Sequence, residues 1–266
     1  MNDNLTLEDL ASKKKNLEGR CLIFISKCNN LEIGSNDELI VKVIFRHLNS
    51  IHDLSIESIS QESTISKAVV SRFFRKYGFD SFADFKYAFD KFFMGVQIRN
   101  DMKVIKQTPL EKYQRAQKNL EDTYSSLDIK KLEKISKMIL NSKEVVFIGD
   151  NHELCTFYTL QLDLMVKNIP AFLYNVNEVT SQTIKSLPEN STIICLSVLY
   201  NWFGEEMDVI CKLAKEKERN TILFSQDVKR QDKYVDILYS YGVENSNNDG
   251  YYSLQLLCNI LGELLN

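Results

Sequence analysis

Apolar residues recur at helical spacing in the first third of the chain, within short segments that polar residues separate. Such spacing places apolar side chains on one face of a helix. It predicts helices in four segments, 36–48, 55–62, 66–77 and 82–92. Residues 1–30 stay unassigned, because the apolar run Cys21–Ile25 is typical of either a strand or a buried helix. An all-α domain is therefore expected within residues 1–95.

Beyond residue 144 the pattern changes to short runs that are apolar throughout. They lie at 145–148, 171–174, 192–196, 221–224 and 235–239. Runs of this kind are typical of strands that a parallel sheet buries on both faces. Helical segments, notably 153–167 and 205–217, lie between several of them. The alternation predicts an α/β domain with a doubly wound parallel sheet of about five strands.

Two further segments complete the predicted organisation. Residues 96–109 are polar and read as a linker, with Pro109 suited to the first turn of a helix that continues to residue 127. The expected domains are thus 1–95, a linker with a connecting helix at 96–127, and 128–266. At the end of the chain a helical stripe of leucines could pack on the sheet or join two subunits. It consists of Leu254, Leu257, Leu261 and Leu264.

The segment 66–78 carries the most informative chemistry. Ser66 is suited to cap the helix with its hydroxyl, and Gly78 to the left-handed position that follows the last turn. The face opposite the apolar one is small, hydroxylic and cationic, and residues 63–77 include no Asp or Glu. With the helix at 55–62 and the turn at 63–65, the spacing is that of a helix-turn-helix whose second helix enters the DNA major groove. A solvated amphipathic helix is the alternative. The predicted DNA-binding residues are Ser66, Lys67, Ala68, Val69, Ser71, Arg72, Arg75 and Lys76.

These residues also carry a family resemblance. The run Ser-Arg-Phe-x-Arg-Lys-x-Gly-Phe at 71–79, followed by Phe-x-x-Phe-Lys at 82–86, resembles the N-terminal domain of RpiR/MurR-type transcriptional regulators. The strand order after residue 107 is similar to the SIS (sugar isomerase) domain that follows it in that family. The resemblance implies a DNA-binding regulator whose second domain senses a sugar or sugar phosphate.

The loops expected to bind that effector depart from the SIS pattern. Ligands of open α/β sheets bind at the carboxyl ends of the strands. The SIS domains that this half of the chain resembles follow this rule when they bind phosphosugars. They have a Gly-x-Gly-x-Ser turn after the first strand and a Ser-x-Ser-Gly-x-Thr loop after the third. Here the candidate ligand residues are Gly149, Asp150, Asn151, His152 and Ser197. Only one glycine and one serine of the pattern remain.

The other residues near these loops also disfavour phosphate. Asp150, Glu153, Glu205 and Glu206 would surround it with negative charge. Either the domain binds a less anionic ligand, or the site is vestigial and the domain serves dimerisation. Aromatic residues of the third loop could stack on a sugar or fill the pocket, and a cation from the fourth loop could restore anion binding. These residues are Tyr200, Trp202 and Phe203, and Lys229 and Arg230.

Composition narrows the function classes. The 266-residue chain has a formal net charge of −3, so any DNA binding must rest on local charge. Its six cysteines include no Cys-x-x-Cys pair and no His at ligand spacing, so neither a metal nor another cofactor is expected. No signal peptide or membrane span is recognised, which favours a cytoplasmic protein with reduced thiols. We expect a non-enzymatic regulator that is at least a dimer, binds double-stranded DNA and takes a sugar-like effector. A phosphosugar isomerase is the alternative.

Overall fold

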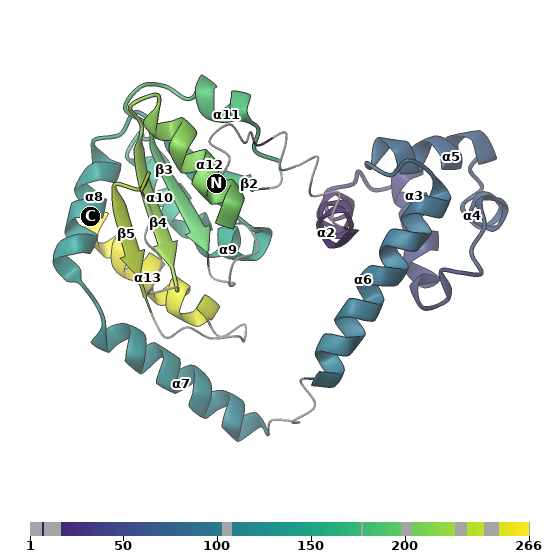
Figure 1. The fold of residues 1–266 in the computed structure, drawn as a ribbon, viewed down its shortest axis with the longest axis horizontal. Helices are drawn as coiled ribbons and strands as arrows, with labels where there is room; N and C mark the ends of the chain where they lie inside the picture. Colours follow the sequence, from purple (N-terminus) through teal and green to yellow (C-terminus); the bar gives the residue numbers. More distant parts are fainter. Residues whose placement is uncertain are drawn as a thin grey trace. The chain divides into compact units, whose positions relative to one another are not determined.

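A computed structural model describes Leu7 and residues 17–102, 108–176, 178–197, 204–226, 233–241 and 250–265 (Figure 1). The chain divides into two compact units. One consists of residues Ser12–Lys106, and the other of Met1–Ala11 together with Gln107–Asn266. The domain boundaries at residues 95 and 127 stay a prediction, since a compact unit is a domain only if it can fold independently.

The first unit is entirely helical in the part described. Its elements are α2 (Leu17–Cys28), α3 (Asn36–Arg46), the 3₁₀ turn η1 (Leu48–Ser50), α4 (Ile56–Ser63), α5 (Lys67–Lys76) and α6 (Phe82–Met102). Ser35 caps α3, and Ser55 forms a capping box with Ser58 at the start of α4. Gly78 takes the predicted left-handed conformation, with φ of 87°. The run Cys21–Ile25, open between strand and helix in the sequence, lies in α2.

Aromatic side chains hold this unit together. Phe24 of α2 is fully buried and makes edge-to-face contacts with six other rings. The six are Phe45, Phe73, Tyr77, Phe79, Phe85 and Phe89. Their ring centroids lie 5.2–6.4 Å from that of Phe24, within the range favoured by aromatic pairs. One residue of α2 therefore contacts rings from α3, α5 and α6.

The second unit is the predicted doubly wound sheet (Figure 1). Its strands are β1 (Val145–Gly149), β2 (Ala171–Asn175), β3 (Thr192–Ser197), β4 (Asn220–Ser225) and β5 (Ile237–Ser240). All neighbours pair in parallel, in the order β2-β1-β3-β4-β5. The helices are α7 (Pro109–Ser125), α8 (Ile129–Leu140), α9 (Asn151–Thr156), α10 (Tyr158–Val166), α11 (Ser181–Ser186), α12 (Gly204–Lys215) and α13 (Gly250–Leu265).

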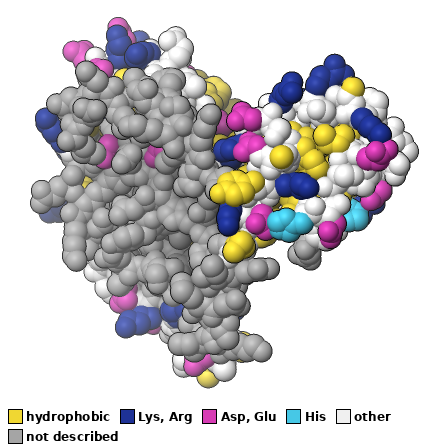
Figure 2. Space-filling model, turned by 45° about the vertical axis from the view of Figure 1, so that its right-hand side comes forward, with side chains coloured by type: hydrophobic (Ala, Val, Ile, Leu, Met, Phe, Trp, Pro, Cys, Tyr) yellow, Lys and Arg dark blue, Asp and Glu magenta, His cyan; other side chains and the backbone are white. Residues whose placement is uncertain are grey.

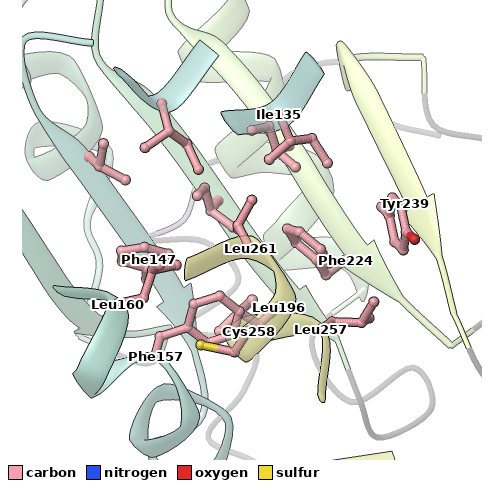
Figure 3. Packing of buried hydrophobic residues seen from close by; sticks show 14 of the residues in the cluster. Ile135, Phe147, Phe157, Leu160, Leu196, Phe224, Tyr239, Leu257, Cys258 and Leu261 are labelled. Carbon is pink, nitrogen blue, oxygen red and sulfur yellow. The ribbon is translucent and has the colours of Figure 1, made fainter. Parts of the chain in front are cut away.

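Two hydrophobic layers cover the two faces of the sheet. One contains Phe147 and Phe224 with residues of α8, α10 and α13 (Figure 3). The other contains Val146 and Ile193 with residues of α11 and α12. Leu7 is buried in this second layer, so this residue packs in the α/β unit although it precedes the helical unit in the sequence. Sequence patterns did not indicate this placement.

The leucine stripe of α13 packs on the chain's own sheet. Leu254, Leu257 and Leu261 are at most 1% exposed within the first layer, and Leu264 is partly buried against it. Figure 3 shows Leu257 and Leu261 among the side chains of this layer. Of the two roles considered for the stripe, packing on the sheet is the one observed. A contact between subunits must therefore use another surface.

Candidate DNA-binding surface and effector site

The turn between α4 and α5 is fixed by short polar side chains. Thr64 has a left-handed conformation, with φ of 60°, and reverses the chain after α4. The Ser60 hydroxyl donates to the carbonyl of Ile65 at 2.6 Å, and that of Ser63 donates to the carbonyl of Ile59 at 2.6 Å. These bonds satisfy buried groups and orient the start of α5.

Ser66 takes the N-cap position of α5, but its hydroxyl does not cap the helix. Its backbone is extended, with φ of −60° and ψ of 145°, and its side chain accepts no amide hydrogen bond from the first turn. The predicted capping bond is therefore absent. The exposed hydroxyl and the amides of the first turn can instead face a ligand.

The two faces of α5 are divided as the sequence predicts. Val70, Phe73 and Phe74 are buried in the aromatic core. Six of the eight predicted DNA-binding residues are exposed, namely Ser66, Lys67, Ala68, Arg72, Arg75 and Lys76. Val69 and Ser71 are half-buried at the edge of this face. All eight residues lie on or next to this one short helix. Together we call them the cationic face of α5.

The lysines of this face are paired, contrary to what its composition suggested. Lys67 binds Glu57 of α4 at 2.5 Å, and Lys76 binds Asp37 of α3 at 2.6 Å. Arg72 and Arg75 form no ion pair with any residue in the described part of the chain. Figure 2 shows the same mixture on one side of the helical unit, where Lys and Arg side chains lie among Asp and Glu. The two arginines are thus the cations most available for an external anion.

The candidate effector residues meet at the carboxyl edge of the sheet. Gly149 ends β1, and Ser197 ends the neighbouring strand β3. Asp150, Asn151 and His152 follow β1 directly and open α9. A Cβ atom on Gly149 would lie 3.0 Å from Cβ of Leu196, so this glycine is needed for close packing between the strands. The predicted loop residues of the other strands, including Tyr200, Trp202, Phe203, Lys229 and Arg230, lie outside the described residues.

Carboxylates accept hydrogen bonds from two backbone amides of the first loop. Asp150 accepts a hydrogen bond from the Glu153 amide at 2.8 Å, and Glu153 Oε2 accepts one from the Asp150 amide at 2.9 Å. Glu153 is buried, and its Oε2 would lie 2.7 Å from a Cβ on Gly149. A capping box of this kind places negative charge at the helix N-terminus, where a phosphate would otherwise be favoured.

Side chains from α13 and β2 contact the residues that follow β1. His152 stacks on Tyr251 of α13 with ring centroids 3.7 Å apart, and the Asn175 amide donates to Asn151 Oδ1 at 2.7 Å. Burial, and then the charges of Asp150 and Glu153, raise the pKa of Tyr251 well above its usual range. It therefore remains a neutral hydroxyl.

Sequence reasoning missed three polar residues at this edge. Tyr251 is one, and Gln226 and Tyr241 are the others. Both amide atoms of Gln226 and the Tyr241 hydroxyl are buried and find no hydrogen-bond partner in the described structure. Their position directly after β4 and β5 is the signal that could have indicated them. A polar ligand or water could satisfy these groups.

Other kinds of site receive no support from the described residues. No group of three or more His, Cys, Asp or Glu among them could hold a metal ion. No described helix is long and apolar enough to cross a membrane. All six cysteines are free, and four of them are buried.

The helical unit matches a known domain. Residues 26–93 match the helix-turn-helix domain of the rpiR family. This part of the chain is an RpiR-family helix-turn-helix domain. A curated relative, an uncharacterised HTH-type transcriptional regulator of Clostridium perfringens, is 24% identical over 200 residues, which are 72% of this chain and 71% of the relative.

Solved structures extend the likeness to the α/β unit. The NanR protein of Vibrio vulnificus, complexed with ManNAc-6P, is similar over 94% of this chain and 91% of its own, with 15% identity and a TM-score of 0.50. The sugar isomerase domain of an RpiR transcription factor from Sphaerobacter thermophilus covers 60% of this chain and 90% of its own, with 15% identity and a TM-score of 0.52. At this identity the likeness shows the fold. An RpiR-family helix-turn-helix domain is followed along the chain by a unit with a SIS-like fold. This is the organisation of an RpiR-type transcription regulator.

Proposed function

We propose that the protein regulates transcription by inserting α5 into the major groove of duplex DNA. The observation that carries this proposal is the cationic face of α5, which has six exposed residues and no acidic residue of its own. Small residues near the start of such a helix contact base edges, while arginines bind guanine edges or phosphates. Binding of the full-length protein to duplex DNA, measured over a range of salt concentrations, tests the proposal.

The genes that it regulates belong, in this proposal, to carbohydrate or sugar-phosphate metabolism. NanR, whose fold is similar, was solved with a phosphosugar, and the sensing unit here has the same architecture. The regulator would act in the cytoplasm, where its DNA is found. It would have no isomerase activity, because that chemistry needs a general base beside a competent phosphate loop.

The effector itself is proposed to be less anionic than a simple hexose phosphate. The capping box of Asp150 and Glu153 uses two amides of the first loop and adds two carboxylates to it. A phosphate dianion would have to be desolvated beside these charges. A neutral sugar, an amino sugar or another polar metabolite would meet carboxylate, amide and hydroxyl partners instead.

Titration calorimetry with hexose, hexosamine and N-acetylated sugar phosphates is expected to show no binding tighter than about 1 mM. Each missing hydrogen bond to a charged group costs roughly 1.5–3 kcal/mol, and two or three such losses turn a micromolar site into one weaker than millimolar. The unphosphorylated sugars are titrated in parallel. Saturable binding of a sugar phosphate below about 100 μM, lost in Asn151→Ala or Ser197→Ala, would contradict this expectation.

The protein is further proposed to be a dimer that uses the outer face of α10. Leu160 and Leu164 pack into the chain's own core, but the opposite face is also apolar. It exposes Tyr158, Leu162, Met165 and Val166, of which Val166 is 83% exposed. A helix that is apolar on two opposite faces is normally covered on both of them.

A second copy of the chain fits this face. The exposed positions between Tyr158 and Val166 carry no charge, so two such faces can meet without burying an unpaired ion. Tyr158 and Val166 lie four residues on either side of Leu162. A two-fold axis beside Leu162 would therefore pair each Tyr158 with Val166 of the second copy, as an isologous contact requires.

Analytical ultracentrifugation at micromolar concentration is expected to show a wild-type dimer. Leu162→Glu would bury a charge at the centre of the contact and raise the dimer dissociation constant at least about 100-fold. Leu140→Glu, the same substitution on α8, is the matched control and should leave the dimer intact. A wild-type protein that sediments as a monomer would end the proposal, and equal behaviour of the two variants would exclude the α10 face.

A further inference from the structure

Two acidic residues from neighbouring helices hold the two ends of the recognition helix. Lys67 is the first residue of α5 and binds Glu57 of α4, and Lys76 is its last residue and binds Asp37 of α3. The two arginines between these ends have no such partner among the described residues. The helix thus carries two lysines that are paired with carboxylates and two arginines that, among the described residues, are free of such pairs and can bind an external anion.

Asp37 makes more than a surface ion pair. Its Oδ2 atom accepts hydrogen bonds from Lys76 Nζ at 2.6 Å and from the Tyr77 hydroxyl at 2.8 Å. The carboxylate is only 17% exposed, whereas the Lys76 side chain is 66% exposed. Asp37 also lies in the first turn of α3, where the helix dipole favours a negative charge. Asp37 is therefore the constrained partner of the pair, and Lys76 is the solvent-exposed one.

The surroundings of Asp37 preserve its hydrogen bond from the Tyr77 hydroxyl. Burial, followed by the hydrogen bond to Asp37, raises the pKa of Tyr77, so its hydroxyl stays a donor throughout the physiological range. Burial and the charge of Asp37 likewise raise the pKa of the Cys28 thiol to about 12. The Tyr77 hydroxyl and the Cys28 thiol are therefore neutral. Within the described residues, Lys76 is the one cation paired with the Asp37 carboxylate.

We propose that Asp37 and Glu57 are specificity-determining residues that withhold Lys76 and Lys67 from DNA phosphates. Phosphate contacts by lysine strengthen binding to every sequence alike, whereas arginine contacts to base edges distinguish sequences. Holding both lysines therefore lowers non-specific affinity and leaves discrimination to the arginines. Asp37 has a second role as a positioning residue, because its bond to Tyr77 fixes the end of α5. The inference rests on the proposed DNA-binding function.

The test is the salt dependence of binding to random duplex DNA, measured on the full-length protein. Asp37→Asn keeps an acceptor for Tyr77 but releases Lys76. Each new phosphate contact steepens the slope of log K against log salt by about 0.9 and strengthens binding up to about eight-fold at 0.1 M salt. Glu57→Gln is expected to shift the slope in the same direction through Lys67 but by less, because both side chains of that pair are more than half exposed. Thermal unfolding of each variant shows that the fold is retained.

Glu38→Gln is the matched control. Glu38 lies next to Asp37 on α3 and pairs with Lys42, so the change in net charge is equal but α5 is untouched. Its salt slope should stay at the wild-type value. Adding Lys76→Ala to Asp37→Asn should cancel the gain, because the released cation is then absent.

The outcomes separate this inference from the proposed function. If Asp37→Asn and Glu57→Gln bind random DNA with the slope of Glu38→Gln, the carboxylates do not withhold the lysines and the inference fails alone. If the wild-type protein shows no salt-dependent DNA binding, the proposed function fails with it.

Discussion

Replacing Arg72 with alanine is expected to weaken binding to the protein's own operator by about 1–3 kcal/mol, roughly 5- to 150-fold. A guanidinium that binds a guanine edge in two places contributes discrimination of this size. Arg72 is exposed in the middle of the cationic face and has no ion-pair partner among the described residues. Binding to random DNA should change far less, so the ratio of the two affinities is the quantity to measure.

Arg75→Ala has a different expected signature. As a phosphate contact, Arg75 contributes to all sequences alike, so its loss should weaken both DNAs and flatten the salt slope by about one unit. Lys76 is also a predicted DNA-binding residue, but its bond to Asp37 makes the expected effect of Lys76→Ala smaller than that of Arg75→Ala. Lys91→Ala removes an exposed cation that lies on α6 and not on α5, and it should leave binding unchanged. Wild-type binding by both arginine variants would show that α5 is not the recognition helix.

The second large effect concerns stability. Phe24→Ala is expected to destabilise the helical unit by about 3–5 kcal/mol, because it removes a fully buried ring and leaves a cavity among six others. Domains of this size have a total stability of about 5–15 kcal/mol. The melting temperature of the unit should therefore fall by at least about 12 °C.

Hydrogen exchange resolved along the chain can assign this loss to one unit. Protection should fall in α3 to α6 and persist in the strands β1 to β5. Tyr87→Ala removes an aromatic ring from an exposed position of α6 and should change stability by no more than about 0.5 kcal/mol. Equal effects of the two variants would mean that α2 is not part of the core.

Local patterns predicted most of the fold. The faces of α5, the turn before it and the five parallel strands all follow from the spacing of apolar residues. The run Cys21–Ile25 could not be assigned, because a short apolar run fits a strand or a buried helix equally well. Its role depends on contacts with distant residues, since Phe24 packs among rings from other helices.

The spacing of apolar residues could not predict interactions between residues that are far apart in the sequence. Asp37 and Lys76 are 39 positions apart, so a helical wheel shows Lys76 as a free cation. Gln226 and Tyr241 follow the ends of separate strands and come to the same edge as the first loop only through the order of the sheet. Sequence spacing indicates which face a residue occupies, but not which distant carboxylate lies opposite it.

Genome-wide mapping of the DNA bound in cells tests the central claim most directly. The wild-type protein should occupy a discrete set of sites that share a two-fold symmetric motif, as two recognition helices in a dimer require. Arg72→Ala, produced at the same level, should lose these sites. Absence of any enriched site for the wild type, or an unchanged set for the variant, would contradict sequence-specific binding through α5.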